Sequence, residues 1–302
     1  MPPMIEALVN PPFNSREITW LPSPAKINLF LHICGRLPSG YHQLQSVFQL
    51  LDYGDKIGFR LNPNSERVKL YDNIDGVSEK DNLISKAAKA LLAHRQNHQG
   101  IDIFVQKSLP MGGGIGGGSS NAATVLLTLN YLWQCDLSLQ ELAHIGLELG
   151  ADVPVFVHGR SAFAEGVGER LAAIELEPQY YLVATPNVHV STADIFAHKD
   201  LPRDSAPISA QQYSFATTRN DCELLVTTLH SQVANLLQWL IHYAPSRMTG
   251  TGASVFAIFN SKEQASKVLQ QLPIDVKGFV AEGVNVSPLH QFFKENGIKI
   301  KA

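Results

Sequence analysis

The chain has few cysteines and no long apolar run. Its three cysteines, Cys34, Cys135 and Cys222, are far apart and form no CxxC pair. This spacing argues against a disulfide framework or a conventional zinc site and predicts reduced thiols. The apolar runs fall short of the ~20 residues that a membrane-spanning helix needs, and the first residues do not resemble a signal peptide. We therefore expect a cytoplasmic protein without a membrane partner.

Basic charge is also scarce. Lys and Arg total 24 against 27 Asp and Glu, which gives a formal net charge of −3. A nucleic-acid-binding domain normally carries a basic stripe or a high isoelectric point, so we expect no nucleic-acid partner. Hydrophobic residues make up 45% of the chain, a proportion typical of a folded globular protein.

Two domains are expected in the 302 residues, because this length exceeds what one hydrophobic core usually supports. Residues 1–18 are interrupted by prolines, and we interpret them as a loose N-terminal extension that catalysis does not need. The pattern of elements restarts near residue 170, which predicts an N-terminal domain at 19–170 and a C-terminal domain at 171–302.

Strand and helix patterns are mixed without a strict βαβα alternation, which favours an α+β fold. Alternating or short apolar runs predict strands at 26–33, 46–51, 101–105 and 153–157. Helical spacing predicts helices at 81–93, 121–134, 138–150 and 222–243. The third of these begins with a capping box formed by Ser138 and Glu141 and ends at Gly150.

The most informative segment is PMGGGIGGGSS, which follows a predicted strand and precedes a predicted helix. Its glycines can adopt left-handed dihedrals and turn successive N–H groups toward one anion. The helix start, where Ser119 or Ser120 is the expected N-cap, adds positive potential. These features predict a phosphate-binding loop made of Pro110, Met111, Gly112, Gly113, Gly114, Ile115, Gly116, Gly117, Gly118, Ser119 and Ser120.

Other nucleotide-binding motifs fit this loop poorly. A Walker A motif needs a lysine that is absent, and a protein-kinase loop would be accompanied by VAIK and HRD segments that the chain lacks. Gly112, Gly114 and Gly117 satisfy GxGxxG, but Asp136, at about the distance of the acidic residue of a dinucleotide site, follows a helix with no strand between. A dinucleotide-dependent oxidoreductase is thus an alternative that tight NAD binding would favour.

The loop resembles the phosphate loop of the GHMP superfamily of small-molecule kinases, P-x-x-x-G-L-G-S-S-A-A. The resemblance covers about residues 20–289 and rests on SPAKINLFL at 23–31, SGYHQLQSVFQLLDYGD at 39–55, LPMGGGIGGGSSNAA at 109–123, LGADVPVFVHGRSAFAEGVGE at 149–169 and PSRMTGTGASVFA at 245–257. One departure is Ser39, where the family often has Asp. The resemblance implies a ribosomal protein S5 domain 2-like N-terminal domain that binds ATP, and a ferredoxin-like C-terminal domain.

Within the superfamily, the chain is most similar to kinases that phosphorylate the 2-hydroxyl of a cytidyl-linked methylerythritol in isoprenoid precursor synthesis. The resemblance implies that Asp152 is the catalytic base and Lys26 the catalytic lysine. A base for the hydroxyl proton and a cation for the developing charge suit phosphoryl transfer, and pairing would satisfy both groups. ATP as co-substrate and Mg²⁺ are expected, although the sequence does not identify ligands for the metal.

The resemblance also implies a cytosine site in which Tyr41 stacks on the base, His42 hydrogen-bonds to it and Phe196 closes the other side. Aromatic faces and a histidine nitrogen suit these roles. Asn28 would bind the erythritol end, with Thr192 as a weaker contact. Alternatives are a GHMP kinase for another alcohol, such as mevalonate or homoserine, and an RNA-binding module. The chain is expected to be a monomer or a homodimer.

Overall fold

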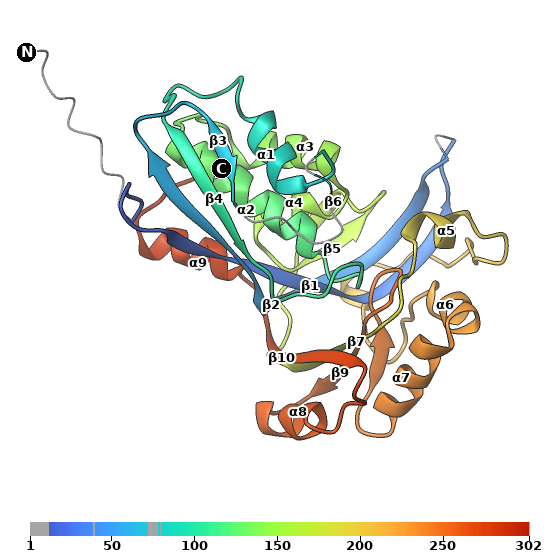
Figure 1. Cartoon of the computed structure of the whole chain (residues 1–302). Coiled ribbons are helices and arrows are strands. Elements are labelled where there is room, and N and C mark those ends of the chain that lie inside the picture. Colours follow the sequence, from blue (N-terminus) through green and yellow to red (C-terminus); the bar gives the residue numbers. More distant parts are fainter. Residues whose placement is uncertain (1–11, 39, 72–77, 79, 302) are drawn as a thin grey trace, which may run out of the picture.

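The computed structural model describes residues 12–38, 40–71, 78 and 80–301. These residues form a mixed α+β structure in which two packed bodies share a long β-hairpin (Figure 1). The hairpin consists of β1 and β2, which pair in antiparallel register and span Thr19–Arg36 and His42–Asn62. The α+β class predicted from the sequence is therefore confirmed.

The first body is a sheet with helices packed against it (Figure 1). Around the hairpin the sheet contains β3 (Val68–Leu70), β4 (Gly100–Gln106), β5 (Ala162–Glu165) and β6 (Arg170–Ala173). The helices are α1 (Leu83–Ala90), α2 (Gly117–Leu132), α3 (Leu139–Leu149) and α4 (Val153–His158). Every residue of α2 from Ser120 to Asn130 is buried, as expected for a helix that is packed on all sides. The helix that follows the glycine loop is thus anchored in the core.

The second body is an antiparallel sheet in the order β10-β7-β9-β8. These strands span Val276–Val284, Tyr180–Pro186, Val255–Phe259 and Ser246–Met248. One face packs against α6 (Glu223–Leu229), α7 (Ser231–Ile241) and α8 (Lys262–Leu269). The other face packs on β1 through Val183 and Phe256, which share a cluster with Ile27 and Leu29. Both faces of β1 are therefore buried, and its polar residues need partners.

The C-terminal segment returns to the first body. Helix α9 (Pro288–Glu295) places Leu289 and Phe293 in the core that contains α2, and Ile298 joins them. Lys301 forms a bridge with Ser138 at the start of α3. The division near residue 170 stays a prediction, but the packing shows that the end of the chain supports the N-terminal core. No helix in the described ranges is long and apolar enough to cross a membrane.

The end of the predicted N-terminal extension is packed, contrary to the interpretation of residues 1–18 as loose. Phe13 is 1% exposed and contacts Phe59 and Tyr131 in the first core. Asn14 accepts a backbone hydrogen bond from Leu61, at the edge of β2. The periodicity of the sequence did not reveal this because a single aromatic residue after two prolines carries no repeating pattern. Residues 1–11 lie outside the described residues.

Replacing Phe13 with alanine is expected to lower the free energy of unfolding by about 3 kcal/mol, because it removes a buried aromatic ring and leaves a cavity. The matched control is Ser15→Ala, at an exposed position two residues away, which should change stability by less than about 0.5 kcal/mol. Urea unfolding of both variants measures the difference. Equal stability of the two variants would mean that the Phe13 contacts contribute nothing.

Two predicted elements are wrong. Residues 153–157, predicted as a strand, form α4, because Pro154 lies in the first turn, where no backbone N–H is needed. The single helix predicted at 222–243 is two helices separated by His230, whose backbone is extended. The hydroxyls of Thr227 and Thr228 donate to carbonyls three or four residues earlier, which weakens the end of α6. The helix predicted from the Ser138–Glu141 capping box is confirmed as α3.

Candidate active site

The glycine loop joins β4 to α2 and leaves the helix start open. The N-cap is Gly116, with a left-handed φ of 75° and no side-chain cap, so the prediction of Ser119 or Ser120 as N-cap is wrong. The first backbone hydrogen bond of α2 is donated by the Ser120 N–H to the Gly116 carbonyl. Among the described residues, the N–H groups of Gly117 and Gly118 have no acceptor. Unpaired donors at a helix start form an anion site.

Close packing holds the loop in place and explains two of its glycines. A Cβ on Gly114, whose φ is 71°, would lie 2.7 Å from the Thr249 carbonyl oxygen. A Cβ on Gly116 would lie 2.8 Å from the ring of Phe156. The segment 248–254, which contains Gly250 and Gly252, therefore packs directly against the glycine loop. This contact joins the C-terminal body to the glycine loop.

Asp55 fixes the entry into the loop and was not identified from the sequence. Its carboxylate is buried and accepts hydrogen bonds from the backbone N–H groups of Ser108 and Leu109, at 2.8 and 2.9 Å. It also forms an ion pair with Lys107. The Lys107 Nζ lies 3.6 Å from where a Cβ on Gly117 would stand, so this positive charge is beside the start of α2. An acidic residue within an apolar strand pattern was the available signal.

Lys26 and Asp152 meet as the sequence predicts. The Lys26 Nζ lies 3.1 Å from Asp152 Oδ2, and their side chains are 3% and 34% exposed. Lys26 also donates to Asn28 Oδ1 at 2.7 Å and to the Gly114 carbonyl at 3.0 Å. The buried ammonium is thus fully paired. Asp152 caps α4 without a side-chain hydrogen bond to that helix, so its carboxylate is free to face the cavity.

The amide of Asn28 has a fixed orientation. Its Oδ1 accepts from Lys26, while its Nδ2 donates to Ser46 Oγ at 2.8 Å. Ser46 in turn donates to the Phe30 carbonyl at 2.6 Å. Ser46 is a second residue that was not identified from the sequence, since a serine in a strand has no distinctive pattern. The chain of bonds leaves Asn28 one amide hydrogen on Nδ2 to donate to a ligand.

Aromatic side chains gather at the other end of the site. The rings of His42 and Phe196 are stacked, with centroids 5.1 Å apart. Tyr41 is 67% exposed and lines the same space. The hydroxyl of Thr192, the first residue of α5 (Thr192–Ala197), is 2.8 Å from that of Thr251. Residues far apart in the sequence thus form one wall.

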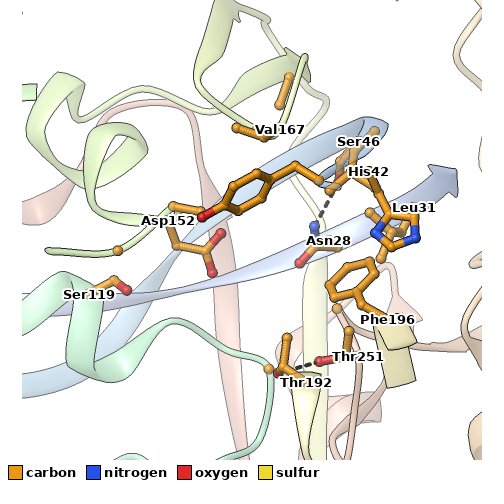
Figure 2. Close-up of a pocket in the computed structure, with 18 of the residues that line it drawn as sticks. Asn28, Leu31, His42, Ser46, Ser119, Asp152, Val167, Thr192, Phe196 and Thr251 are labelled. Atoms are coloured by element: carbon orange, nitrogen blue, oxygen red, sulfur yellow. Dashed lines mark hydrogen bonds between the residues drawn. The ribbon is translucent and has the colours of Figure 1, made fainter. Parts of the chain in front are cut away.

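The Lys26–Asp152 pair, Asn28 and the aromatic side chains line one cavity of about 930 Å³. In Figure 2, Asp152 and Ser119 lie on one side, His42 and Phe196 on the other, and Asn28 between them. Every predicted catalytic and substrate residue lines this cavity: Lys26, Asn28, Tyr41, His42, Asp152, Thr192 and Phe196. From the predicted loop only Gly114 and Ser119 reach it, while Ile115 and Ser120 are buried and Met111 is 55% exposed.

Comparisons with known proteins agree with this geometry. The family model described as GHMP kinases N terminal domain matches residues 82–160, and the model described as GHMP kinases C terminal matches residues 201–277. The fold is thus that of the GHMP kinases, which are ATP-dependent small-molecule kinases. This finding decides against the dinucleotide-dependent oxidoreductase.

Individual relatives indicate which GHMP kinase the chain resembles. Two proteins named 4-diphosphocytidyl-2-C-methyl-D-erythritol kinase, from Pseudoalteromonas atlantica and Shewanella loihica, are 59% and 52% identical to the chain. Each alignment covers 91% of this chain, and 96% and 97% of the respective relatives. A crystal structure of 4-(cytidine 5'-diphospho)-2C-methyl-D-erythritol kinase matches with a TM-score of 0.78 and 26% identity over 88% of this chain and all of that one. The chain belongs to the family of 4-diphosphocytidyl-2-C-methyl-D-erythritol kinases.

The fold alone is shared more widely. The L. major mevalonate kinase solved with R-mevalonate matches with a TM-score of 0.62 and 16% identity, over 90% of this chain and 97% of that one. The GHMP architecture therefore does not select the alcohol that is phosphorylated. Selection has to come from the side chains that line the cavity.

Proposed function

We propose that the chain transfers the γ-phosphate of ATP to the 2-hydroxyl of 4-diphosphocytidyl-2-C-methyl-D-erythritol, giving the 2-phosphate and ADP for isoprenoid precursor synthesis by the non-mevalonate pathway. One observation carries this proposal: a single cavity has the Lys26–Asp152 pair beside the phosphate loop at one end and the His42–Phe196 aromatic pair at the other. A substrate with an alcohol at one end and a base at the other matches this arrangement.

Asp152 acts as the general base in this proposal. Its Oδ2 is paired with Lys26, while its Oδ1 makes no hydrogen bond within the described part of the chain. The carboxylate accepts the proton of the 2-hydroxyl as the oxygen attacks the γ-phosphorus, and the bond between that phosphorus and the ADP oxygen breaks. The Lys26 ammonium offsets the negative charge around the reacting oxygens.

Asn28 and the aromatic wall orient the substrate. The remaining amide hydrogen of Asn28 suits an oxygen of the methylerythritol end, and Thr192 lines the same cavity. Tyr41, His42 and Phe196 suit a pyrimidine base through ring faces and a ring nitrogen. Mevalonate and homoserine have no base to occupy this end, so the same residues disfavour them as substrates.

Mg²⁺ is part of the proposal, and the residues present fit it. Mg²⁺ usually binds through one or two protein oxygens together with substrate phosphates and waters. Among the described residues, no group of three or more His, Cys, Asp or Glu is arranged to hold a metal by itself. The hydroxyl of Ser119 and the carboxylate of Glu148 line the cavity and would supply protein oxygens. Bound there with ATP, the ion neutralises phosphate charge.

The proposal also includes a cytoplasmic location and a monomeric or homodimeric state. Free thiols at Cys34, Cys135 and Cys222 are consistent with a reducing compartment. Sedimentation of the purified protein measures the oligomeric state.

ADP release with three candidate alcohols tests the activity. We expect rapid ADP formation from ATP, Mg²⁺ and 4-diphosphocytidyl-2-C-methyl-D-erythritol, and a kcat/KM at least about 10³-fold lower with mevalonate or homoserine, because these leave the base end empty. Nucleotide binding is measured in parallel. Turnover of mevalonate or homoserine at an equal rate would contradict the substrate, and folded protein that binds no ATP would contradict the kinase itself.

A further inference from the structure

Arg203 lies outside the cavity and forms hydrogen bonds with both His42 and Phe196, whose stacked rings mark the end proposed to bind the base. Its Nε donates to His42 Nε2 at 2.9 Å. Its Nη2 donates to the carbonyls of Phe196 and His198, at 3.0 and 2.9 Å, and its Nη1 to the carbonyl of Leu201 at 2.8 Å. Arg203 does not line the cavity. Any effect on a substrate therefore has to act through His42 and Phe196.

The Arg203–His42 bond determines where the imidazole carries its proton. A guanidinium has only donors, so His42 Nε2 must accept, and the ring proton of the neutral imidazole is then on Nδ1. Burial lowers the pKa of His42, and the charges of Arg203 and Arg36 lower it further, so the ring stays neutral near pH 7. His42 is thereby a donor at Nδ1 and has no free acceptor nitrogen.

The Nδ1 donor has no partner in the described parts of the protein, and His42 lines the cavity. Cytosine has two acceptors on its base-pairing edge, the ring nitrogen N3 and the exocyclic oxygen O2, and uracil shares only O2. In uracil N3 carries a hydrogen, so a fixed donor that faces N3 pairs with cytosine and opposes uracil. Sites built around a hydrogen bond reject analogues that leave a buried polar group unpaired.

Resting on the proposed function, we propose that Arg203 is a positioning residue for base specificity. It selects the Nδ1–H tautomer of His42 and holds the His42 and Phe196 rings in place, so that the cavity offers a hydrogen-bond donor to N3 of cytosine. A role confined to loop structure would involve the three carbonyl bonds alone. The bond to His42 distinguishes the two roles, because only that bond determines which ring nitrogen of His42 carries the proton.

Arg203→Gln and Arg203→Lys form a matched pair for the test. Both variants lose the guanidinium that donates to three backbone carbonyls. The lysine ammonium can only donate to His42, whereas the glutamine amide can also accept and permits either tautomer. We expect R203Q to raise KM for the cytidyl substrate about tenfold with kcat within about twofold, and to reduce the preference for that substrate over its uridyl analogue about tenfold. R203K should retain most of the preference for the cytidyl substrate over its uridyl analogue. The KM for ATP should not change.

Nitrogen-15 NMR of histidine-labelled protein tests the tautomer without turnover. We expect Nδ1–H in the wild type and R203K, and a mixture or Nε2–H in R203Q. An unchanged His42 tautomer and unchanged base preference in R203Q, with lower stability alone, would overturn the proposal. If R203Q does not fold, Arg203→Met, which removes every donor at this position, replaces it, and an unchanged Nδ1–H form in that variant would have the same consequence. A wild type that binds ATP but phosphorylates neither pyrimidine substrate contradicts the proposed function instead, and the spectra still decide whether Arg203 sets the tautomer.

Discussion

Replacing Asp152 with asparagine is expected to lower kcat about a thousandfold, within the 10²- to 10⁴-fold range of general-base catalysis. Asparagine preserves shape but cannot take the hydroxyl proton. Lys26 keeps its bonds to Asn28 and Gly114, so the buried ammonium remains paired and the fold should persist. Steady-state kinetics measure kcat, and a titration with ATP should give a dissociation constant close to that of the wild type.

Asp136→Asn is the matched control for this change. Asp136 is an exposed carboxylate that pairs with Lys301 and does not line the cavity. Its backbone φ of 55° is one that asparagine tolerates. The control should retain the wild-type kcat. If the Asp152 variant kept kcat within about tenfold of the wild type, general-base catalysis by that carboxylate would be the wrong mechanism.

Replacing Gly114 with alanine is expected to weaken ATP binding about 100-fold or more and to destabilise the protein. The new Cβ would lie 2.7 Å from the Thr249 carbonyl and 3.0 Å from that of Gly252. Both contacts are with backbone, which cannot move aside as a side chain can. The loop must shift, and each 1.4 kcal/mol of lost binding energy is a tenfold loss of affinity.

Gly297→Ala separates this clash from backbone strain. Gly297 has a similar φ of 67°, but a Cβ there would have no atom within 4 Å. A left-handed alanine costs about 1–2 kcal/mol, so both variants should lose that stability, and only the Gly114 variant should lose nucleotide affinity. Calorimetric titration with ATP and thermal unfolding provide both quantities. Unchanged affinity in the Gly114 variant would show that the loop does not need this conformation.

The sequence predicted those features that depend on local patterns. The capping box at Ser138 and Glu141 defines α3 because both partners lie within one turn. The pairing of Lys26 with Asp152 is a long-range contact: a charge on a buried strand indicated that Lys26 needs a partner, and the resemblance to the GHMP kinases indicated Asp152. The strand predicted at 153–157 was wrong because a short apolar run is equally compatible with a buried helix.

Other long-range contacts were not predicted from the sequence. The bonds from Arg203 to His42, and from Ser46 to Asn28, join segments whose proximity follows from the packing of the whole molecule. The return of α9 to the first core also has no local signal, because its apolar stripe indicates burial without naming the surface that covers it. Periodicity identifies a buried face, but only the fold identifies its partner.

Phosphorus-31 NMR of a complete reaction tests the central claim most directly. Purified protein is incubated with ATP, Mg²⁺ and 4-diphosphocytidyl-2-C-methyl-D-erythritol. We predict one new phosphomonoester signal that grows in equal amount with ADP, while the signals of the cytidyl diphosphate remain. ADP accompanied by inorganic phosphate alone, or no ADP from folded protein that binds ATP, would contradict the assignment of this cavity as the kinase site.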